Sequence, residues 1–165
     1  MKVFKFGGAS VKDAAGVQNL VLVLEKVGFK ETLIVVSAMG KTTNALEAII
    51  ETYFKNKKQT PKGIHALKQF HLDVVKDLFR EESGEVETAI HQLFEELIAF
   101  FNTNKSPDYS FVYDQVVSYG ELLSTTIIHH FIQKKKIDSF WLDARNCIKT
   151  DDYYRSAKVN WSQTQ

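Results

Sequence analysis

The sequence predicts an α/β protein with parallel strands and a helical insertion. Two short runs rich in β-branched and aromatic residues, Val3–Phe6 and Thr32–Ser37, flank a segment whose apolar residues have helical spacing. Such a β-α-β unit normally makes a right-handed crossover between parallel strands. From Lys62 to Phe101 the apolar residues again repeat with a helical period, which predicts a pair of helices inserted after this unit.

The first strand ends at the glycine pair Gly7-Gly8. The helix that follows it is expected to stop at Gly28, the usual position of a C-capping glycine. Its apolar positions are Val17, Leu20, Val21, Leu24 and Val27. The run Thr32–Ser37 is almost wholly apolar, so we expect it to be a central strand buried on both faces.

A second amphipathic helix is expected just after Thr42-Thr43-Asn44, with its N-terminus at that turn. Its apolar positions are Leu46, Ile49, Ile50, Tyr53 and Phe54. Ser83-Gly84 divides the inserted helical pair, whose lysine-rich and glutamate-rich faces are interpreted as solvated surfaces. A further helix is expected from about Tyr119 to Lys136, followed by a third strand at Ser139–Asp143.

Composition indicates one ordinary globular domain. The chain has 165 residues, of which 44% are apolar and 12% aromatic, enough to bury a core. Lys and Arg number 21 against 20 Asp and Glu, and this formal charge of +1 favours neither nucleic acid nor an anionic membrane as a partner. The single Cys147 cannot form an internal disulfide, and neither a signal-peptide core nor a membrane-spanning apolar run is found. We therefore expect a soluble, cytoplasmic protein.

The segment Lys5-Phe6-Gly7-Gly8-Ala9-Ser10 is a candidate phosphate-binding loop. Adjacent glycines let the backbone turn and bring amide groups close to an anion, and a following helix N-terminus would favour negative charge. Lys5 could neutralise transferring phosphoryl oxygens. A plain strand-to-helix turn explains the glycines equally well, and the segment is neither a Walker A loop nor a Rossmann fingerprint.

Two further segments could face the same cleft. Ser37–Asn44 follows the second strand, and ligands bind at the carboxyl ends of parallel strands. The alternative is that Asn44 caps the next helix, with Glu47 three residues later as in a capping box. Glu121, at the start of the helix that follows Ser118, could hold a substrate ammonium or could simply favour the helix dipole.

Together these segments make the chain resemble the aspartate kinases of the amino acid kinase superfamily over essentially its full length. The matching blocks, in family order, are Lys-Phe-Gly-Gly-x-Ser-Val, Val-Val-Ser-Ala-Met-Gly-Lys-Thr-Thr-Asn, Ser-x-Gly-Glu-Leu-Leu-Ser, and Asp143-Ala144-Arg145 followed by Thr150-Asp151-Asp152. The opening Lys-x-Gly-Gly is shared with acetylglutamate and uridylate kinases. The Ser-Ala-Met and Ser-x-Gly-Glu blocks point to aspartate kinase.

The resemblance implies a role for each matching residue. Lys5 would be catalytic and would contact the ATP phosphates, with Gly7, Gly8 and Ser10 lining the phosphate loop. Thr43 and Glu121 match residues that contact aspartate. Ala9 stands where the family often has Thr, so only its backbone contribution carries over. Asp151 and Asp152 match a motif that we interpret as structural, and no residue is assigned to a metal. The cofactor of the complete enzyme would be ATP with Mg²⁺.

The resemblance also implies a fold and a reaction. The fold would be a three-layer α/β/α sandwich with a mainly parallel sheet, of which residues 1–165 form a single incomplete domain, the N-terminal, substrate-side half. The reaction would be ATP-dependent phosphorylation of L-aspartate to 4-phospho-L-aspartate, the first step towards lysine, threonine and methionine. The nucleotide-binding half, with its Gly-Arg-Gly-Gly-Ser-Asp motif, and the regulatory ACT domains are not in this sequence.

Two expectations follow from this incompleteness. The 165-residue chain alone should be nearly inactive, because half of the ligands that orient the reactants are missing. An uncovered sheet edge and helix faces should favour a homodimer. The alternatives are a non-catalytic binding or assembly module with the same fold, or a kinase for another acceptor such as acetylglutamate.

Overall fold

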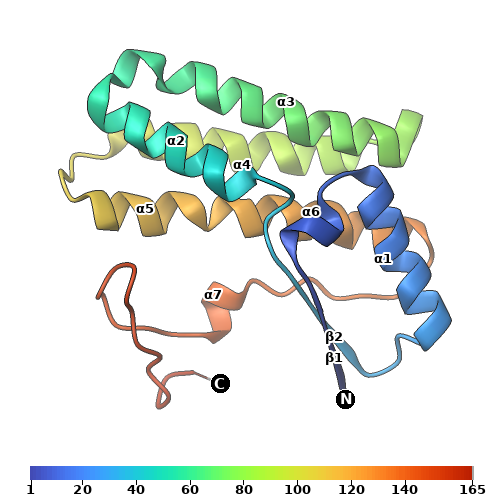
Figure 1. The fold of residues 1–165 in the computed structure, drawn as a ribbon. Coiled ribbons are helices and arrows are strands. Elements are labelled where there is room, and N and C mark those ends of the chain that lie inside the picture. Colours follow the sequence, from blue (N-terminus) through green and yellow to red (C-terminus); the bar gives the residue numbers. More distant parts are fainter. Residues whose placement is uncertain (165) are drawn as a thin grey trace.

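The computed structural model describes residues 1–164, and Gln165, the last residue of the expected domain, lies outside them (Figure 1). Strands β1 (Lys2–Phe6) and β2 (Thr32–Val36) are parallel, with Lys2 opposite Thr32 and Phe6 opposite Val36. Helix α1 (Ala14–Val27) connects them and ends at Gly28, which has a φ of 79°. The β-α-β unit and its glycine C-cap are thereby confirmed.

The rest of the described chain is mainly helical (Figure 1). The remaining α-helices are α2 (Thr42–Lys55), α3 (Thr60–Phe79), α4 (Gly84–Thr103), α5 (Tyr109–Val117), α6 (Tyr119–Lys134) and α7 (Ala144–Cys147). Short 3-10 turns, η1 to η3, cover Gly8–Val11, Lys57–Gln59 and Arg80–Glu82. Helices α3 and α4 confirm the inserted pair on either side of Ser83. None of the helices in residues 1–164 is long and apolar enough to cross a membrane.

One buried cluster joins the helices to the sheet. Ile90, Phe94 and Leu97 of α4 are completely buried at its centre, as are Leu24 of α1 and Leu46 of α2. Burying each such side chain contributes about 1.5–3 kcal/mol to folding. This packing holds α2 and α6 against the carboxyl ends of the two strands, where the candidate site lies (Figure 1).

The expectation that the second strand is buried on both faces is wrong. Val36 is buried and Ile34 packs against the core, but Leu33 and Val35 are each 44% exposed. The neighbouring Val3 of β1 is also exposed. The reason is that the packed helices of residues 1–164 cover only one face of this two-stranded sheet, so alternate side chains of β2 face outward.

The third strand expected at Ser139–Asp143 is not formed. A strand needs a hydrogen-bonding neighbour, and the sheet of the described chain contains only β1 and β2. Instead, the Trp141 Nε1–H donates to Thr125 Oγ1 of α6 at 3.0 Å. The intervening Phe140 is 87% exposed. This segment therefore runs along α6, held by side chains in place of a strand ladder.

Helix α5 was not expected from the periodicity. Its N-terminus is capped by Asp108, whose Oδ1 accepts from the Ser110 amide at 2.8 Å. The helix expected from about Tyr119 to Lys136 is confirmed as α6, which ends two residues earlier, at Lys134. Because α5 leads almost directly into α6, the Ser118 junction places the start of α6 beside the strand ends (Figure 1).

Candidate functional site

The loops that follow β1 and β2 are joined at the carboxyl ends of the strands. The Ser37 amide donates to the Phe6 carbonyl at 3.1 Å, and the Gly40 amide donates to the Gly8 carbonyl at 3.0 Å. A Cβ on Gly8 would lie 2.6 Å from the Ala38 carbonyl oxygen, so this close approach requires glycine. The two segments singled out in the sequence therefore form one surface.

The side chain of Lys5 lies beside the glycine pair. The Lys5 Nζ lies 3.5 Å from the position that a Cβ on Gly7 would occupy, so the ammonium lies over bare backbone. The Ser10 amide donates to the Gly7 carbonyl at 2.9 Å and closes the turn. A cation beside backbone without side chains allows a phosphate group to approach closely. These residues therefore fit the phosphates of a nucleotide.

The helix expected directly after the glycine pair is displaced. Gly8–Val11 forms a 3-10 turn, and α1 begins only at Ala14. The N-terminus of α1 is already capped by Asp13, whose Oδ1 accepts from the Gly16 amide at 2.9 Å. The favourable dipole predicted at the phosphate loop is therefore not supplied by α1, and Lys5 supplies positive charge over the glycine pair.

Glu121 connects the third segment to the loop after β2. Its Oε1 accepts from the Ala38 amide at 3.1 Å. The nearby Ser124 Oγ donates to the Ser37 carbonyl at 2.9 Å. A Cβ on Gly120 would lie 2.8 Å from the Ala38 Cβ, so glycine allows α6 to pack this closely. Ser124 is the last residue of the Ser-x-Gly-Glu-Leu-Leu-Ser block, but no role was predicted for it, although its position three residues after Glu121 places it on the same side of a helix.

Thr43 lies in the first turn of α2, half-buried. The predicted Asn44 cap is wrong because the Thr42 amide bonds to the Met39 carbonyl at 2.9 Å, which starts the helix two residues earlier. Glu47 accepts from the Tyr113 hydroxyl at 2.8 Å and does not form a capping box. The early start of α2 brings Thr43 next to the loop at Gly40. The side chains of Ser10 and Thr43 make no hydrogen bond between the loop after β1 and the loop after β2.

A buried histidine lies behind this surface. His71 of α3 is fully buried, and its Nδ1 lies 2.9 Å from the Leu67 carbonyl oxygen. Since a carbonyl can only accept, Nδ1 carries the proton and Nε2 is left to accept from the Thr42 hydroxyl, 3.4 Å away. This contact ties α3 to the first residue of α2. Its sequence signal is a histidine four residues after Leu67 on the apolar face of the helix.

Burial makes His71 a source of pH-dependent stability. Desolvation lowers the pKa of His71 from 6.5 to about 4, so the unfolded chain binds a proton that the folded chain excludes between these values. The contribution of His71 to the free energy of unfolding is fully present above pH 6.5 and is lost as the pH decreases towards 4. We expect the wild-type chain to lose about 2 kcal/mol more than His71→Gln between pH 7 and pH 5 in urea titrations.

The matched control for this measurement is His65→Gln, which removes an exposed histidine from the same helix. That variant should lose as much stability as the wild type over the same interval. Equal losses in the wild type and in His71→Gln would contradict the assignment of this pH dependence to His71.

The remaining matching motifs lie on the C-terminal segment. Asp143 caps α7 and pairs with Arg145 at 2.7 Å, and this hydrogen bond lowers the pKa of Asp143. Asp151 Oδ1 accepts from the amides of Tyr153 and Lys158, which organises a turn. Within residues 1–164 no hydrogen bond connects these residues to the three loops, and no three His, Cys, Asp or Glu side chains gather as a metal site.

The chain is similar in sequence to proteins of a known family. The model of the amino acid kinase family matches residues 1–164. Lysine-sensitive aspartokinase 3 of Escherichia coli is 24% identical over 157 residues, covering 94% of this chain and 34% of that protein. Aspartokinase 1, chloroplastic, of Arabidopsis thaliana is 30% identical over 161 residues, covering 92% of this chain and 27% of that protein.

The fold is also found among solved structures. Aspartokinase III of Escherichia coli, solved in complex with aspartate and ADP, superposes with a TM-score of 0.86 at 22% identity, covering 99% of this chain and 35% of that one. The chain thus spans about a third or less of the length of these relatives. On the family match over nearly its whole length, the chain belongs to the amino acid kinase family.

Proposed function

We propose that this chain carries the substrate-side part of an aspartate kinase, which transfers the γ-phosphoryl group of ATP to the side-chain carboxylate of L-aspartate. The observation that carries the proposal is the single surface on which Lys5, the Gly7-Gly8 turn and Glu121 are joined through the loop after β2. The names of the relatives, which are aspartokinases, support this acceptor.

Each residue has a distinct role in the proposed reaction. Lys5 stabilises charge on the transferring phosphoryl group, and Gly7, Gly8 and Ser10 line the phosphates of Mg-ATP. Thr43 and Glu121 hold aspartate. Because Oε1 of Glu121 already accepts from the Ala38 amide, Oε2 remains to accept from the substrate ammonium.

We further propose that the chain is one part of a three-layer kinase domain, to which a nucleotide-binding part must be added. In-line transfer needs both reactants held in position, and orientation of this kind supplies several kcal/mol of the barrier reduction. Residues 1–165 alone are therefore expected to have almost no kinase activity towards aspartate. We expect their dissociation constants for ATP and for aspartate to be millimolar or weaker.

The proposal is tested by trapping the acyl phosphate product. A complete kinase domain containing this chain is incubated with Mg-ATP and hydroxylamine, which converts an aspartyl phosphate into a hydroxamate. L-aspartate should give hydroxamate and N-acetylglutamate should give none. Hydroxamate from N-acetylglutamate alone would overturn the choice of acceptor, and product from neither acceptor would favour a non-catalytic module.

Self-association of residues 1–165 is a separate prediction. The outward face of the sheet exposes Val3, Leu33 and Val35 beside Lys5, and an uncovered, mostly apolar sheet face favours pairing with a second copy. We expect a two-fold dimer in sedimentation velocity experiments, and we expect Val35→Lys to shift it to monomer. Val27→Lys, at an exposed position of α1, should leave the dimer intact. A wild-type monomer at the highest soluble concentration would contradict the prediction.

A further inference from the structure

A hollow lies between α2 and α3, and Lys41 and Thr42, which follow the loop after β2, are among its lining residues. Its volume is about 550 Å³, which is within the range of sites that take a small molecule. The side chains that line it are mostly small or apolar, with two lysines at its ends. They are Lys41, Thr42, Ala45, Ala48, Ile49, Thr52, Gln59, Thr60, Lys62, Gly63, Ala66, Leu67 and Phe70.

The hollow arises from the sizes of these side chains. Helices α2 and α3 touch at Gly63, where a Cβ would lie 2.7 Å from Ile49 Cγ1. Ala48 and Ala66 also line the hollow, and their methyl groups are too short to fill the space between the helices. An apolar surface that the protein leaves uncovered in this way is suited to an apolar ligand.

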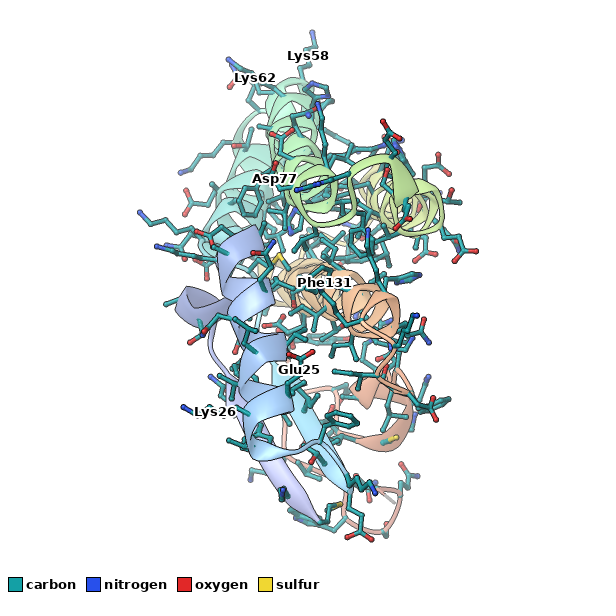
Figure 2. All side chains as sticks on the ribbon, turned by 90° about the vertical axis from the view of Figure 1, so that its right-hand side faces the viewer. Glu25, Lys26, Lys58, Lys62, Asp77 and Phe131 are labelled. Atoms are coloured by element: carbon teal, nitrogen blue, oxygen red, sulfur yellow. The ribbon has the colours of Figure 1, made fainter. Side chains whose placement is uncertain are left out.

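One end of the hollow favours an anion. It is formed by the N-terminus of α3, which has no side-chain cap and no acidic residue in its first turn among the described residues. Lys62 lines this end, and Lys58 lies close to it, just before the start of α3 (Figure 2). Within residues 1–164 the only charged side chains that line the hollow are Lys41 and Lys62. The helix dipole and the lysines therefore act in the same direction.

A buried hydroxyl at this end has no partner. Thr60 is 3% exposed, and its Oγ1 makes no hydrogen bond within the described residues. Buried polar atoms are nearly always hydrogen-bonded, so an unpaired one suggests a missing group. Thr60 also lines a second, smaller cavity of about 240 Å³, whose charged and titratable lining residues are Tyr53, Lys57, His65 and Lys68. Both hollows meet at Thr60, and both are lined by basic and not acidic groups.

We propose that the hollow between α2 and α3 binds a free acyl carboxylate of medium chain length. The hydrocarbon chain lies along Ala48, Ala66 and Phe70, and the carboxylate lies at the N-terminus of α3. There it accepts hydrogen bonds from Lys62 and from Thr60 after a rotation of the threonine side chain. The hollow is open to solvent along Ala48 and Ala66, which are both exposed, and its volume has room for one extended chain. The inference is independent of the kinase reaction, because it uses none of the residues assigned to it.

The test is calorimetric titration of the 165-residue chain with sodium decanoate, without ATP or aspartate. One saturable site per chain with a micromolar dissociation constant is expected. Because the carboxylate supplies part of the recognition, 1-decanol should bind at least fivefold more weakly, and decyltrimethylammonium more weakly still. Equal binding of decanoate and decyltrimethylammonium would overturn the proposal, as would the absence of saturable decanoate binding.

Two variants locate the site. Ala66→Trp and Ala48→Trp fill the hollow from opposite helices, and each should weaken decanoate binding at least tenfold. Two variants, one on each helix, are used in case one of them fails to fold. Circular dichroism shows whether each variant is folded. Ala99→Trp, at an exposed position of α4, is the matched control and should bind as the wild type does. Unchanged binding in a folded Ala66→Trp or Ala48→Trp variant would overturn the assignment.

Lys62→Gln tests the carboxylate end and should reduce the preference for decanoate over 1-decanol at least threefold. A preference unchanged by this substitution would overturn the placement of the carboxylate.

Vesicles of phosphatidylglycerol distinguish the two sources of acyl chains. If the chain sediments with the vesicles and Ala66→Trp abolishes this sedimentation, the hollow binds a lipid surface and the proposal of a free ligand is overturned. If the chain does not sediment with the vesicles, the free acyl carboxylate is supported.

Discussion

Lys5→Met is expected to lower kcat about 100-fold or more, with little change in the KM for aspartate, in a complete kinase domain that contains this chain. The reason lies in where the ammonium is placed. It lies over the Gly7 backbone, 3.5 Å from the position of a Cβ there, and α1 adds no free N-terminus beside it because Asp13 caps that helix. Charge that develops during phosphoryl transfer would therefore lose the cation that lies over the glycine turn.

The effect should depend on the position of the lysine and not on net charge. Lys26→Met is the matched control, since Lys26 extends outward from α1 (Figure 2) and is exposed. That variant should retain the wild-type kcat. Lys5→Arg keeps the charge but changes its shape, so it should recover only part of the rate. A kcat within about threefold of the wild type for Lys5→Met would contradict the assigned role, because loss of one such donor typically costs 100-fold or more.

Glu121→Gln is expected to weaken aspartate binding by about 1.5–3 kcal/mol and to leave ATP binding almost unchanged. The substitution is informative because glutamine retains an oxygen that can accept from the Ala38 amide, as Oε1 of Glu121 does at 3.1 Å. The packing of α6 against the loop after β2 can therefore persist while the negative charge is lost. Aspartate and ATP affinities are measured separately, by inhibition kinetics or titration of the complete domain.

Glu25→Gln is the control for this substitution. Glu25 lies on α1, is exposed and belongs to none of the three loops (Figure 2). It should leave both affinities unchanged. Equal loss of aspartate and ATP binding in Glu121→Gln would show that Glu121 acts only by holding the start of α6 in place. In that case its favourable position at a helix N-terminus would be its whole contribution.

Much of the local structure could be predicted from the sequence because it depends on neighbouring residues. The spacing of Val17, Leu20 and Leu24 predicts α1, and Gly28 ends it with a φ that glycine adopts without strain. The same periodicity predicts α3 and α4 on either side of Ser83. The loop motifs at Gly7-Gly8 and at Ser37–Thr43 could be predicted to meet, since parallel strands bring their carboxyl ends to one edge.

Contacts between distant segments decided the rest. Asn44 has the chemistry of a cap, but a bond from the Thr42 amide to Met39 starts α2 before it. Ser139–Asp143 has a strand composition, yet in residues 1–164 it finds no strand to pair with. Val35 looks like a core residue and is 44% exposed, because composition records how apolar a strand is and not which of its faces is covered.

The candidate site also has residues that the sequence predicts and contacts that only the tertiary structure shows. Lys5, Gly7, Gly8 and Glu121 are identifiable from motifs, because phosphate and ammonium recognition restricts which residue types can serve. The bond from the Ala38 amide to Glu121 and the contact of His71 with Thr42 join residues 83 and 29 positions apart. Helical and strand periods extend over a few residues only, whereas contacts across such distances depend on how whole helices pack. Only the tertiary structure could therefore show them.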